Sequence, residues 1–396
     1  MAGLAEQITM DTVYFNKAFV AHDKATVSIK DRGFLYSDSI YETLPIENAR
    51  CLSLNDRLDR LNDNLKQLSI QPPHSHQEWH QILTELIEKN RAESGRYYIY
   101  VHITRGVSPI RQLHIPESIQ PTVLAFMGKI PTTQTEVYQK GFKVITVEDN
   151  RRRDCFIKST GLLPNIMAFD QAQQKSVDDI IYQHQGYVLE SSSSNLFIVE
   201  KDRLITPPAN YQIINGITRQ TVIELAKLLE VDCEERLVSL DELRNADEIW
   251  LTASNKDIVP VIELNSQRIG NGKAGPMWHR FDQALTDYKL YSSILLTATD
   301  NGDQPMTDHH ESSSPLEFPC EFFVKIIMKN SDDCEEKVTA IIQRHFDAFN
   351  ADELSLRPSK NDNYLALTAK LQVPEKAPLD ALYKDLSDEP EVLMAL

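Results

Sequence analysis

The chain has 396 residues, which at about 150 residues per domain corresponds to two or three domains. It is 41% hydrophobic and 25% charged, and this globular composition excludes disordered and collagen-like architectures. Its 41 basic and 58 acidic side chains give a net charge of −17, which would repel nucleic acids and anionic membrane surfaces. We therefore expect neither a nucleic acid nor a membrane as a partner.

No apolar run approaches the roughly 18 residues that a membrane-spanning helix requires. The first residues, MAGLAEQITMDTVYF, lack the basic and apolar blocks of a secretory signal, so we expect a cytoplasmic protein. The five cysteines are scattered and form no C-x-x-C pair, a pattern typical of reduced thiols. We expect no disulfide framework and no metal site.

The first 130 residues are predicted to form an α+β lobe. Leucines at helical spacing predict a helix over 54–69, a second helix is expected near 76–94, and YYIYVHITRG reads as a strand. A passage rich in Pro and Thr near residue 130 marks the boundary.

Residues 131–295 are predicted to form a second, α/β lobe. It opens with the strand KVITVED and closes with a helix ending near Tyr291, with several short β elements and two clear helices between them.

Residues 296–315 are polar and turn-rich, which is typical of a flexible linker. We assign no function to His309 and His310 within it, because two adjacent histidines without a third partner do not make a metal site. Residues 316–396 repeat a complete pattern of strand and helix periodicities, and the order is β-α-β-β-α-β if LSLRPS is a short strand. This pattern predicts a small ferredoxin-like domain with an antiparallel sheet and two helices on one face.

Two motifs in the second lobe suggest chemistry. Lys158 follows two apolar residues in FIKSTGLLPN, and desolvation would make its amine available as a Schiff-base nucleophile. Glu190 ends an apolar strand before SSSSN, where a carboxylate can hold a positive charge such as a protonated pyridine nitrogen. Each motif alone also has a purely structural explanation. Lys158 could be a surface lysine, and Glu190 could belong to a hairpin turn.

Two further motifs suggest an anion site. Asn215 and Gly216 form a turn before an amphipathic helix beginning at Thr218, and a helix N-terminus offers free N–H groups to a phosphate. Ser254 in LTASNKDIVPV follows an apolar strand and can add a hydroxyl to the same anion. An ordinary capped helix would explain the turn equally well.

In this order and spacing the motifs resemble the fold-type IV pyridoxal phosphate aminotransferases, and the similarity extends over almost all of residues 12–290. The matching segments are DRGFLYSDSIYETL, DRLDRLNDNL, IKSTGLLPN, ESSSSN, NGITR and ASNKDIVPV.

The resemblance implies roles for individual residues. Lys158 would hold pyridoxal 5'-phosphate as a Schiff base and act as the catalytic acid and base, and Glu190 would pair with the pyridinium nitrogen. The remaining cofactor-binding residues, mainly around the phosphate, would be Arg60, Ile214, Ile217, Thr218 and Ser254.

The segments SIYETL and TRGVSPIRQLHIPE are most similar to the D-amino acid aminotransferase branch. By this resemblance Tyr41, Arg111 and His114 would bind the substrate carboxylate, although Ile110 is inserted in the pattern. The enzyme would exchange amino groups between D-amino acids such as D-alanine and 2-oxo acids such as 2-oxoglutarate. Members of this family bind substrate at a dimer interface, which implies a homodimer.

Two other branches share the cofactor motifs. The branched-chain L-amino acid aminotransferases usually have a tyrosine five residues after the lysine, where this chain has Leu163. The aminodeoxychorismate lyases have the same cofactor site, and these motifs do not exclude them.

The last 80 residues or so resemble the small YbeD-like family through EFPCEFFVK, RPSKNDNY and VLMAL. This resemblance brings no catalytic residues, so the domain is expected to bind a partner of unknown identity. A further alternative is a regulatory or scaffold protein in which the aminotransferase lobes are vestigial.

Overall fold

The computed structural model describes residues 10–116, 119–151, 154–210, 212–296, 320–331, 333–358, 364–374, 376–389 and 391–395. The chain divides into two compact units, Met1–Thr299 and Asp300–Leu396, and each is described by itself. The predicted linker lies outside the described residues except at Leu296, as do His309 and His310.

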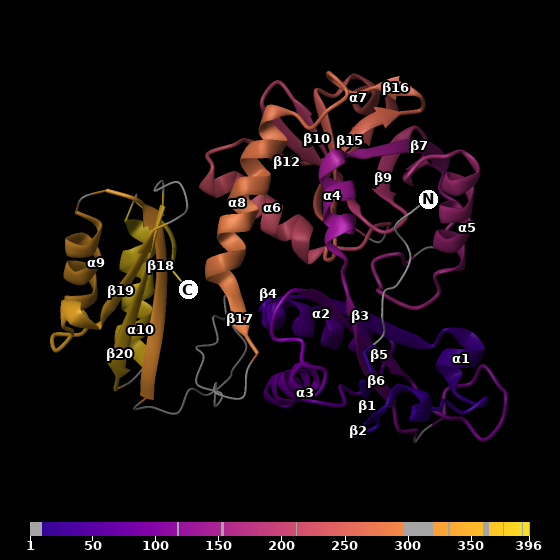
Figure 1. Cartoon of the computed structure of the whole chain (residues 1–396), viewed down its shortest axis with the longest axis horizontal. Coiled ribbons are helices and arrows are strands. Elements are labelled where there is room, and N and C mark those ends of the chain that lie inside the picture. Colours follow the sequence, from indigo (N-terminus) through magenta and orange to yellow (C-terminus); the bar gives the residue numbers. More distant parts are fainter. Residues whose placement is uncertain are drawn as a thin grey trace. The chain divides into compact units, whose positions relative to one another are not determined.

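The first unit contains two separate sheets (Figure 1). The first sheet has seven strands, in the order β17 (Ser293–Leu295), β4 (Arg50–Leu52), β3 (Ser39–Glu47), β5 (Arg96–Thr104), β6 (Thr122–Lys129), β1 (Thr12–Phe15) and β2 (Ala18–Ala21). All the strand pairs recorded in this sheet are antiparallel. Strand β17 comes from the far end of the unit and pairs with β4, so the chain returns to the first sheet after it has completed the second.

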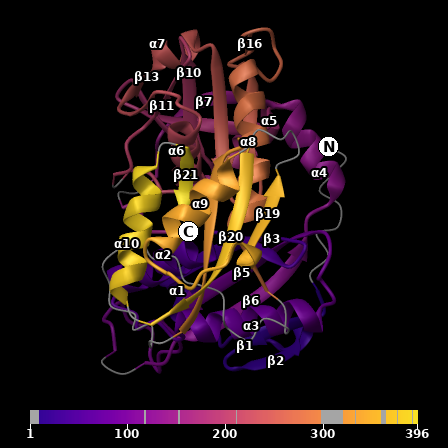
Figure 2. The same cartoon turned by 90° about the vertical axis from the view of Figure 1, so that its left-hand side faces the viewer.

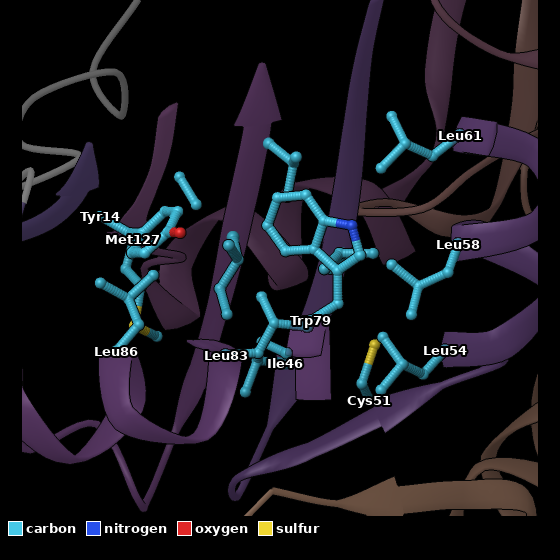
Figure 3. Close-up of a cluster of buried hydrophobic side chains, with 14 of the residues drawn as sticks. Tyr14, Ile46, Cys51, Leu54, Leu58, Leu61, Trp79, Leu83, Leu86 and Met127 are labelled. Carbon is cyan, nitrogen blue, oxygen red and sulfur yellow. The ribbon is translucent and has the colours of Figure 1, made fainter. Parts of the chain in front are cut away.

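Three α-helices accompany this sheet: α1 (Arg32–Tyr36), α2 (Leu54–Gln67) and α3 (His76–Lys89). The predicted leucine stripe of α2 is buried and packs in one cluster with Trp79 and Leu83 of α3 and with Ile46 of the sheet (Figure 3). Shortening such a fully buried leucine to alanine typically costs about 2–5 kcal/mol. This packing fixes the orientation of α2, which carries two arginines of the site described below.

Helix α3 is shorter than the expected span of 76–94. It begins with a capping box between Ser75 and Glu78 and ends at Lys89. The side chain of Asn90 bonds to both the N–H and the carbonyl of Thr12 in β1, so a tertiary contact ends the helix where the periodicity alone did not.

The second sheet is mixed and runs in the order β12 (Cys233–Glu235), β11 (Arg203–Thr206), β10 (Asn195–Glu200), β14 (Glu248–Ala253), β15 (Asp257–Leu264), β7 (Phe142–Glu148), β8 (Asp179–His184), β9 (Tyr187–Ser191) and β13 (Val238–Ser239), with β16 (Gln267–Arg268) paired to β15. The accompanying helices are α4 (Thr132–Lys140), α5 (Leu163–Gln174), α6 (Ile217–Leu228), α7 (Leu240–Asn245) and α8 (Pro276–Ser292). These two sheets confirm the expected mixed α/β fold, while the exact lobe limits stay a prediction.

The second unit has the predicted β-α-β-β-α-β order: β18 (Cys320–Lys329), α9 (Cys334–Gln343), β19 (Leu354–Pro358), β20 (Tyr364–Val373), α10 (Lys376–Asp388) and β21 (Val392–Ala395). Its antiparallel sheet runs β19-β20-β18-β21. Alternate β18 residues, Val324, Ile326 and Met328, share one core with both helices, so α9 and α10 cover the same face (Figure 2). The LSLRP part of the expected strand supplies β19, and the expected ferredoxin-like arrangement is confirmed.

Candidate active site

The first unit contains a cavity of about 1120 Å³ that residues of both lobes line. It contains eight of the ten site residues expected from the sequence, namely Tyr41, Arg60, Lys158, Glu190, Ile214, Ile217, Thr218 and Ser254. These residues come from six separate stretches of the chain. The fold therefore brings together motifs that are more than 200 residues apart, from Tyr41 to Ser254.

Lys158 lies at the cavity wall on the loop before α5. Its N–H donates to Oδ1 of Asn64 (2.8 Å), and its carbonyl accepts from the N–H of Tyr41 (3.1 Å), so both neighbouring elements fix its backbone. Its Nζ lies 4.2 Å from the centroid of the Tyr41 ring and forms no ion pair in the part of the chain that the structure describes. An amine at the wall of a cavity can reach an aldehyde bound there, as Schiff-base formation requires.

Glu190 is the penultimate residue of β9 and is 5% exposed. Its Oε1 accepts from Nη1 of Arg151 (2.5 Å), and its Oε2 accepts from Nδ2 of Asn195 and the N–H of Ile214 (both 3.2 Å). Burial raises the pKa of Glu190 to about 7, while Arg151 and the Ile214 N–H act in the opposite direction. The carboxyl group therefore changes between its protonated and ionised forms near neutral pH. A cation arriving beside it would favour the ionised form.

The N-terminus of α6 forms another part of the wall. No side chain caps this helix, so the first N–H groups, which have no partner within any helix, face the Gly216 turn. A Cβ on Gly216 would collide with Oδ1 of Asn195, so the close approach of this turn to β10 requires glycine. Thr218 and Ile217 lie in the cavity lining at this end.

Arg60 and Ser254 face the cavity from other elements. Arg60 on α2 makes a bidentate ion pair with Glu42 (2.9 Å for both bonds) and donates to the carbonyl of Asn215 (3.0 Å). Although burial acts in the opposite direction, Arg60 holds the pKa of Glu42 below its usual value. Ser254 Oγ accepts from Nη1 of Arg57 (2.6 Å), which leaves its O–H proton available to a ligand.

The cavity also has buried polar atoms without partners. Oγ of Ser194 and Oγ1 of Thr252 belong to lining residues and have no hydrogen-bond partner among the described residues. Leaving such groups unsatisfied costs about 1–3 kcal/mol each, which a bound polar ligand would recover. The α6 N-terminus, these hydroxyls, a lysine and a buried carboxylate together fit a phosphorylated pyridine aldehyde.

Arg111 and His114 do not join the other eight residues. Both are exposed and lie outside the cavity lining. Arg111 stacks over the ring of Tyr36, a lining residue (5.7 Å), while Arg32 donates to the carbonyls of Gln112, Leu113 and His114. The carboxylate-binding group of Tyr41, Arg111 and His114 is not assembled within one chain and stays a prediction.

Sequence reasoning missed two arginines at the site. Arg57 is 1% exposed and reaches Ser254 from α2, and Arg151 contacts Glu190 from the end of β7. Arg57 precedes Arg60 by three residues and therefore lies on the same helix face, which was the available signal. Arg151 lies in an RRR run, which looks like a solvated surface segment.

The described residues contain no group of three or more His, Cys, Asp or Glu side chains placed to hold a metal ion. Within the same residues, no helix has both the length and the apolar character needed to cross a bilayer.

Comparison with known proteins gives two family matches. Residues 39–264 match the model for amino-transferase class IV. Residues 313–396 match the model described as protein of unknown function (DUF493), which confirms the distinct C-terminal domain.

Among curated proteins, the D-alanine aminotransferase of Bacillus licheniformis is 33% identical over 273 residues, covering 69% of this chain and 95% of that protein. The D-alanine aminotransferase of Staphylococcus aureus strain MSSA476 is 29% identical over 286 residues, covering 72% and 100%.

Among solved structures, the branched-chain amino acid aminotransferase from Escherichia coli aligns with a TM-score of 0.64 at 24% identity, covering 73% of this chain and 95% of that one. A hypothetical aminotransferase from Mycobacterium tuberculosis, in a PLP-bound form, aligns with a TM-score of 0.63 at 20% identity, covering 71% and 99%. At these identities the structures establish the fold alone.

Proposed function

Because the chain belongs to the class IV aminotransferases, which are pyridoxal phosphate-dependent enzymes acting on amino and 2-oxo acids, we propose that it is a D-amino acid transaminase. Its donors would be D-amino acids such as D-alanine, and its acceptors 2-oxo acids such as 2-oxoglutarate. The observation that carries the proposal is the meeting of Lys158, Tyr41, Glu190 and the α6 N-terminus in one cavity, in a chain 33% identical to a D-alanine aminotransferase.

The choice of branch rests on sequence. The relatives named above are D-alanine aminotransferases, whereas the branched-chain enzymes are similar in fold only. Leu163, the first residue of α5, lines the cavity where the branched-chain resemblance calls for a tyrosine. This difference supports the D-amino acid branch.

The cofactor-binding roles proposed for the residues follow from their positions. Lys158 would bind the cofactor aldehyde, Glu190 the ring nitrogen, and the phosphate would lie among Arg60, Ile217, Thr218 and Ser254, with Ile214 beside Glu190. When bound, pyridoxal phosphate supplies an electron-withdrawing ring that accepts the electron pair left as the Cα–H bond breaks.

The protein's own residues would then direct the proton. Lys158 Nζ would act as the base and then the acid that moves the proton at substrate Cα. Glu190 would hold a proton on the ring nitrogen. Tyr41, whose ring contacts Lys158 Nζ, would face the substrate carboxylate.

We propose a homodimer because apolar side chains are exposed near the cavity. Leu163 and Ile166 of α5, which line it, are 67% and 63% exposed, and Leu113, beside His114, is 81% exposed. Exposed apolar patches of this kind mark interaction sites. A second copy covering them would place a 105–116 loop near the neighbouring cavity, where Arg111 and His114 would complete the carboxylate-binding group.

A spectroscopic donor scan tests the proposed reaction. The visible absorption band of the cofactor-loaded chain should bleach with D-alanine and not with L-alanine. Bleaching by L-leucine alone would support the branched-chain alternative and refute the proposal. Turnover of aminodeoxychorismate without an amino acceptor would assign the chain to the lyases, and the absence of any bleaching would favour a regulatory role.

A further inference from the structure

A chain of ionic contacts leads from Glu190 through Arg151 to Asp149, which lies outside the cavity lining. Nη1 of Arg151 contacts Glu190, while its Nε and Nη2 contact Oδ1 and Oδ2 of Asp149 at 2.9 and 3.1 Å. Glu190 and Arg151 line the cavity, but Asp149 does not. The three residues therefore form a triad in which only the first two can touch a ligand.

Arg151 is held rigidly in this triad. Its side chain is 7% exposed, its Nη2 also donates to the carbonyl of Gln212 (3.1 Å), and its guanidinium lies 4.2 Å from the centroid of the Tyr182 ring. The N–H of Arg151 donates to Oδ1 of Asp149 (2.9 Å), so the acid fixes the backbone as well as the side chain. A bidentate carboxylate on one side and a ring face on the other leave the guanidinium little freedom.

The charges of the triad determine what it attracts. Glu190 and Arg151 alone would form a neutral pair, and a neutral buried pair has little preference for a positively charged ligand. With Asp149 included, and with Glu190 ionised as a cation beside it would favour, two anions and one cation leave a single net negative charge. That charge matches one protonated ring nitrogen.

We propose that Asp149, acting through Arg151, is a positioning residue that makes the Glu190 site select a cationic ring nitrogen. Arg151 fixes one oxygen of Glu190, while Asp149 restores the negative charge that Arg151 would otherwise cancel. This inference rests on the proposed function, since it concerns how the chain would bind the ring of its cofactor. It assigns a role to a residue that does not touch the cofactor.

Comparing the binding of two aldehydes distinguishes this role from a purely structural one. The full-length cofactor-free chain is loaded either with pyridoxal phosphate or with the analogue that has a C–H in place of the ring nitrogen, and both affinities are measured by fluorescence titration. The wild type should bind pyridoxal phosphate more tightly than the analogue. The ratio of the two affinities reports on the ring nitrogen alone, because both compounds share the aldehyde and the phosphate.

Asp149→Asn should lower this ratio roughly tenfold by weakening binding of pyridoxal phosphate, with the affinity for the analogue changing less than about twofold. Asparagine keeps the oxygen that accepts the Arg151 N–H, so the substitution removes charge with little change of shape. Asp149→Glu, which keeps the negative charge, should keep the wild-type ratio of the two affinities. Asp241→Asn, which breaks the exposed ion pair with Arg244 on α7, is the matched control and should leave the ratio unchanged.

An unchanged ratio in Asp149→Asn, or an equal loss of affinity for both compounds, would overturn the inference and leave Asp149 as a structural residue. Should Asp149→Asn fail to fold, Asp149→Ser makes the same comparison. If the wild type binds neither aldehyde, the proposed function fails together with this inference. If the wild type prefers pyridoxal phosphate and Asp149→Asn keeps that preference, the inference alone fails.

Discussion

Nη1 of Arg57 donates a hydrogen bond of 2.6 Å to Oγ of Ser254, and this contact joins α2 of the first lobe to the residue just after β14 in the second. The guanidinium is fully buried, and its Nε donates to the carbonyl of Leu52 (3.0 Å). The bond uses a lone pair of Ser254, which orients the hydroxyl proton away from Arg57. We therefore expect Arg57 to prepare Ser254 as a donor to the cofactor phosphate.

Arg57→Lys should weaken binding of pyridoxal phosphate by roughly ten- to a hundredfold, since a charge-assisted hydrogen bond contributes about 1.5–3 kcal/mol. Binding of unphosphorylated pyridoxal should change much less. Lys66→Ala, an exposed substitution on the same helix, serves as the control. Equal losses for both aldehydes would show that Arg57 supports the lobe junction and not the phosphate.

Lys158→Ala should abolish both the visible cofactor band and transamination, because no other amine matches the motif for the cofactor aldehyde. The measurement is an absorption spectrum followed by borohydride reduction and mass spectrometry. Lys175→Ala, at the exposed end of α5, should keep both properties. A reducible adduct that persists in Lys158→Ala would move the catalytic role to another lysine.

The cofactor-free protein should lose stability as the pH rises from 5 to 8, through Glu190. Burial raises the pKa of this carboxyl group to about 7, against about 4.3 in an unfolded chain. The folded state therefore holds the proton more tightly, and the stabilisation is complete below pH 4.3 and lost as the pH rises through 7.

Relative to Glu190→Gln, the wild type should lose roughly 2–3 kcal/mol of unfolding free energy over this range. Urea titration followed by tryptophan fluorescence isolates the first unit, because Trp79, Trp250 and Trp278 all lie within it. Parallel pH curves for the two proteins would mean that Glu190 is ionised throughout, with Arg151 outweighing burial.

Much of the site could be predicted from sequence because each motif forms a local structure. Gly216 directly precedes an amphipathic helix both in the sequence pattern and in the structure, where it is the N-cap residue of α6. The spacing of Arg57 and Arg60 indicated a shared helix face, but the contacts of Arg57 and Arg151 could not be predicted. Their partners Ser254 and Glu190 are 197 and 39 residues away, and only the tertiary fold buries the two arginines. The early end of α3 likewise depends on the contact of Asn90 with a strand 78 residues away.

The surroundings of Arg111 could not be predicted from one sequence for a different reason, since in the proposed dimer a second chain would complete them. Arg111→Ala should raise the KM for D-alanine roughly ten- to a hundredfold and leave the cofactor spectrum intact. Steady-state kinetics measures this effect, and Arg91→Ala at another exposed arginine is the control. A change of less than threefold would mean that Ile110 turns the loop away and that Tyr41 binds the carboxylate with other residues.

Leu113→Asp should dissociate the proposed dimer, because it would place a charge in the contact that is proposed to cover this exposed side chain. Sedimentation velocity of the wild type and the variant measures the change. A wild type that is monomeric at micromolar concentration would refute the shared site, and with it the role of Arg111.

The chirality of the glutamate formed from 2-oxoglutarate is the most direct test of the central claim. The cofactor-loaded full-length chain is incubated with 2-oxoglutarate and racemic alanine, and the products are separated by chiral chromatography. We predict D-glutamate, with D-alanine consumed and L-alanine left unchanged. Formation of L-glutamate with consumption of L-alanine would contradict the account.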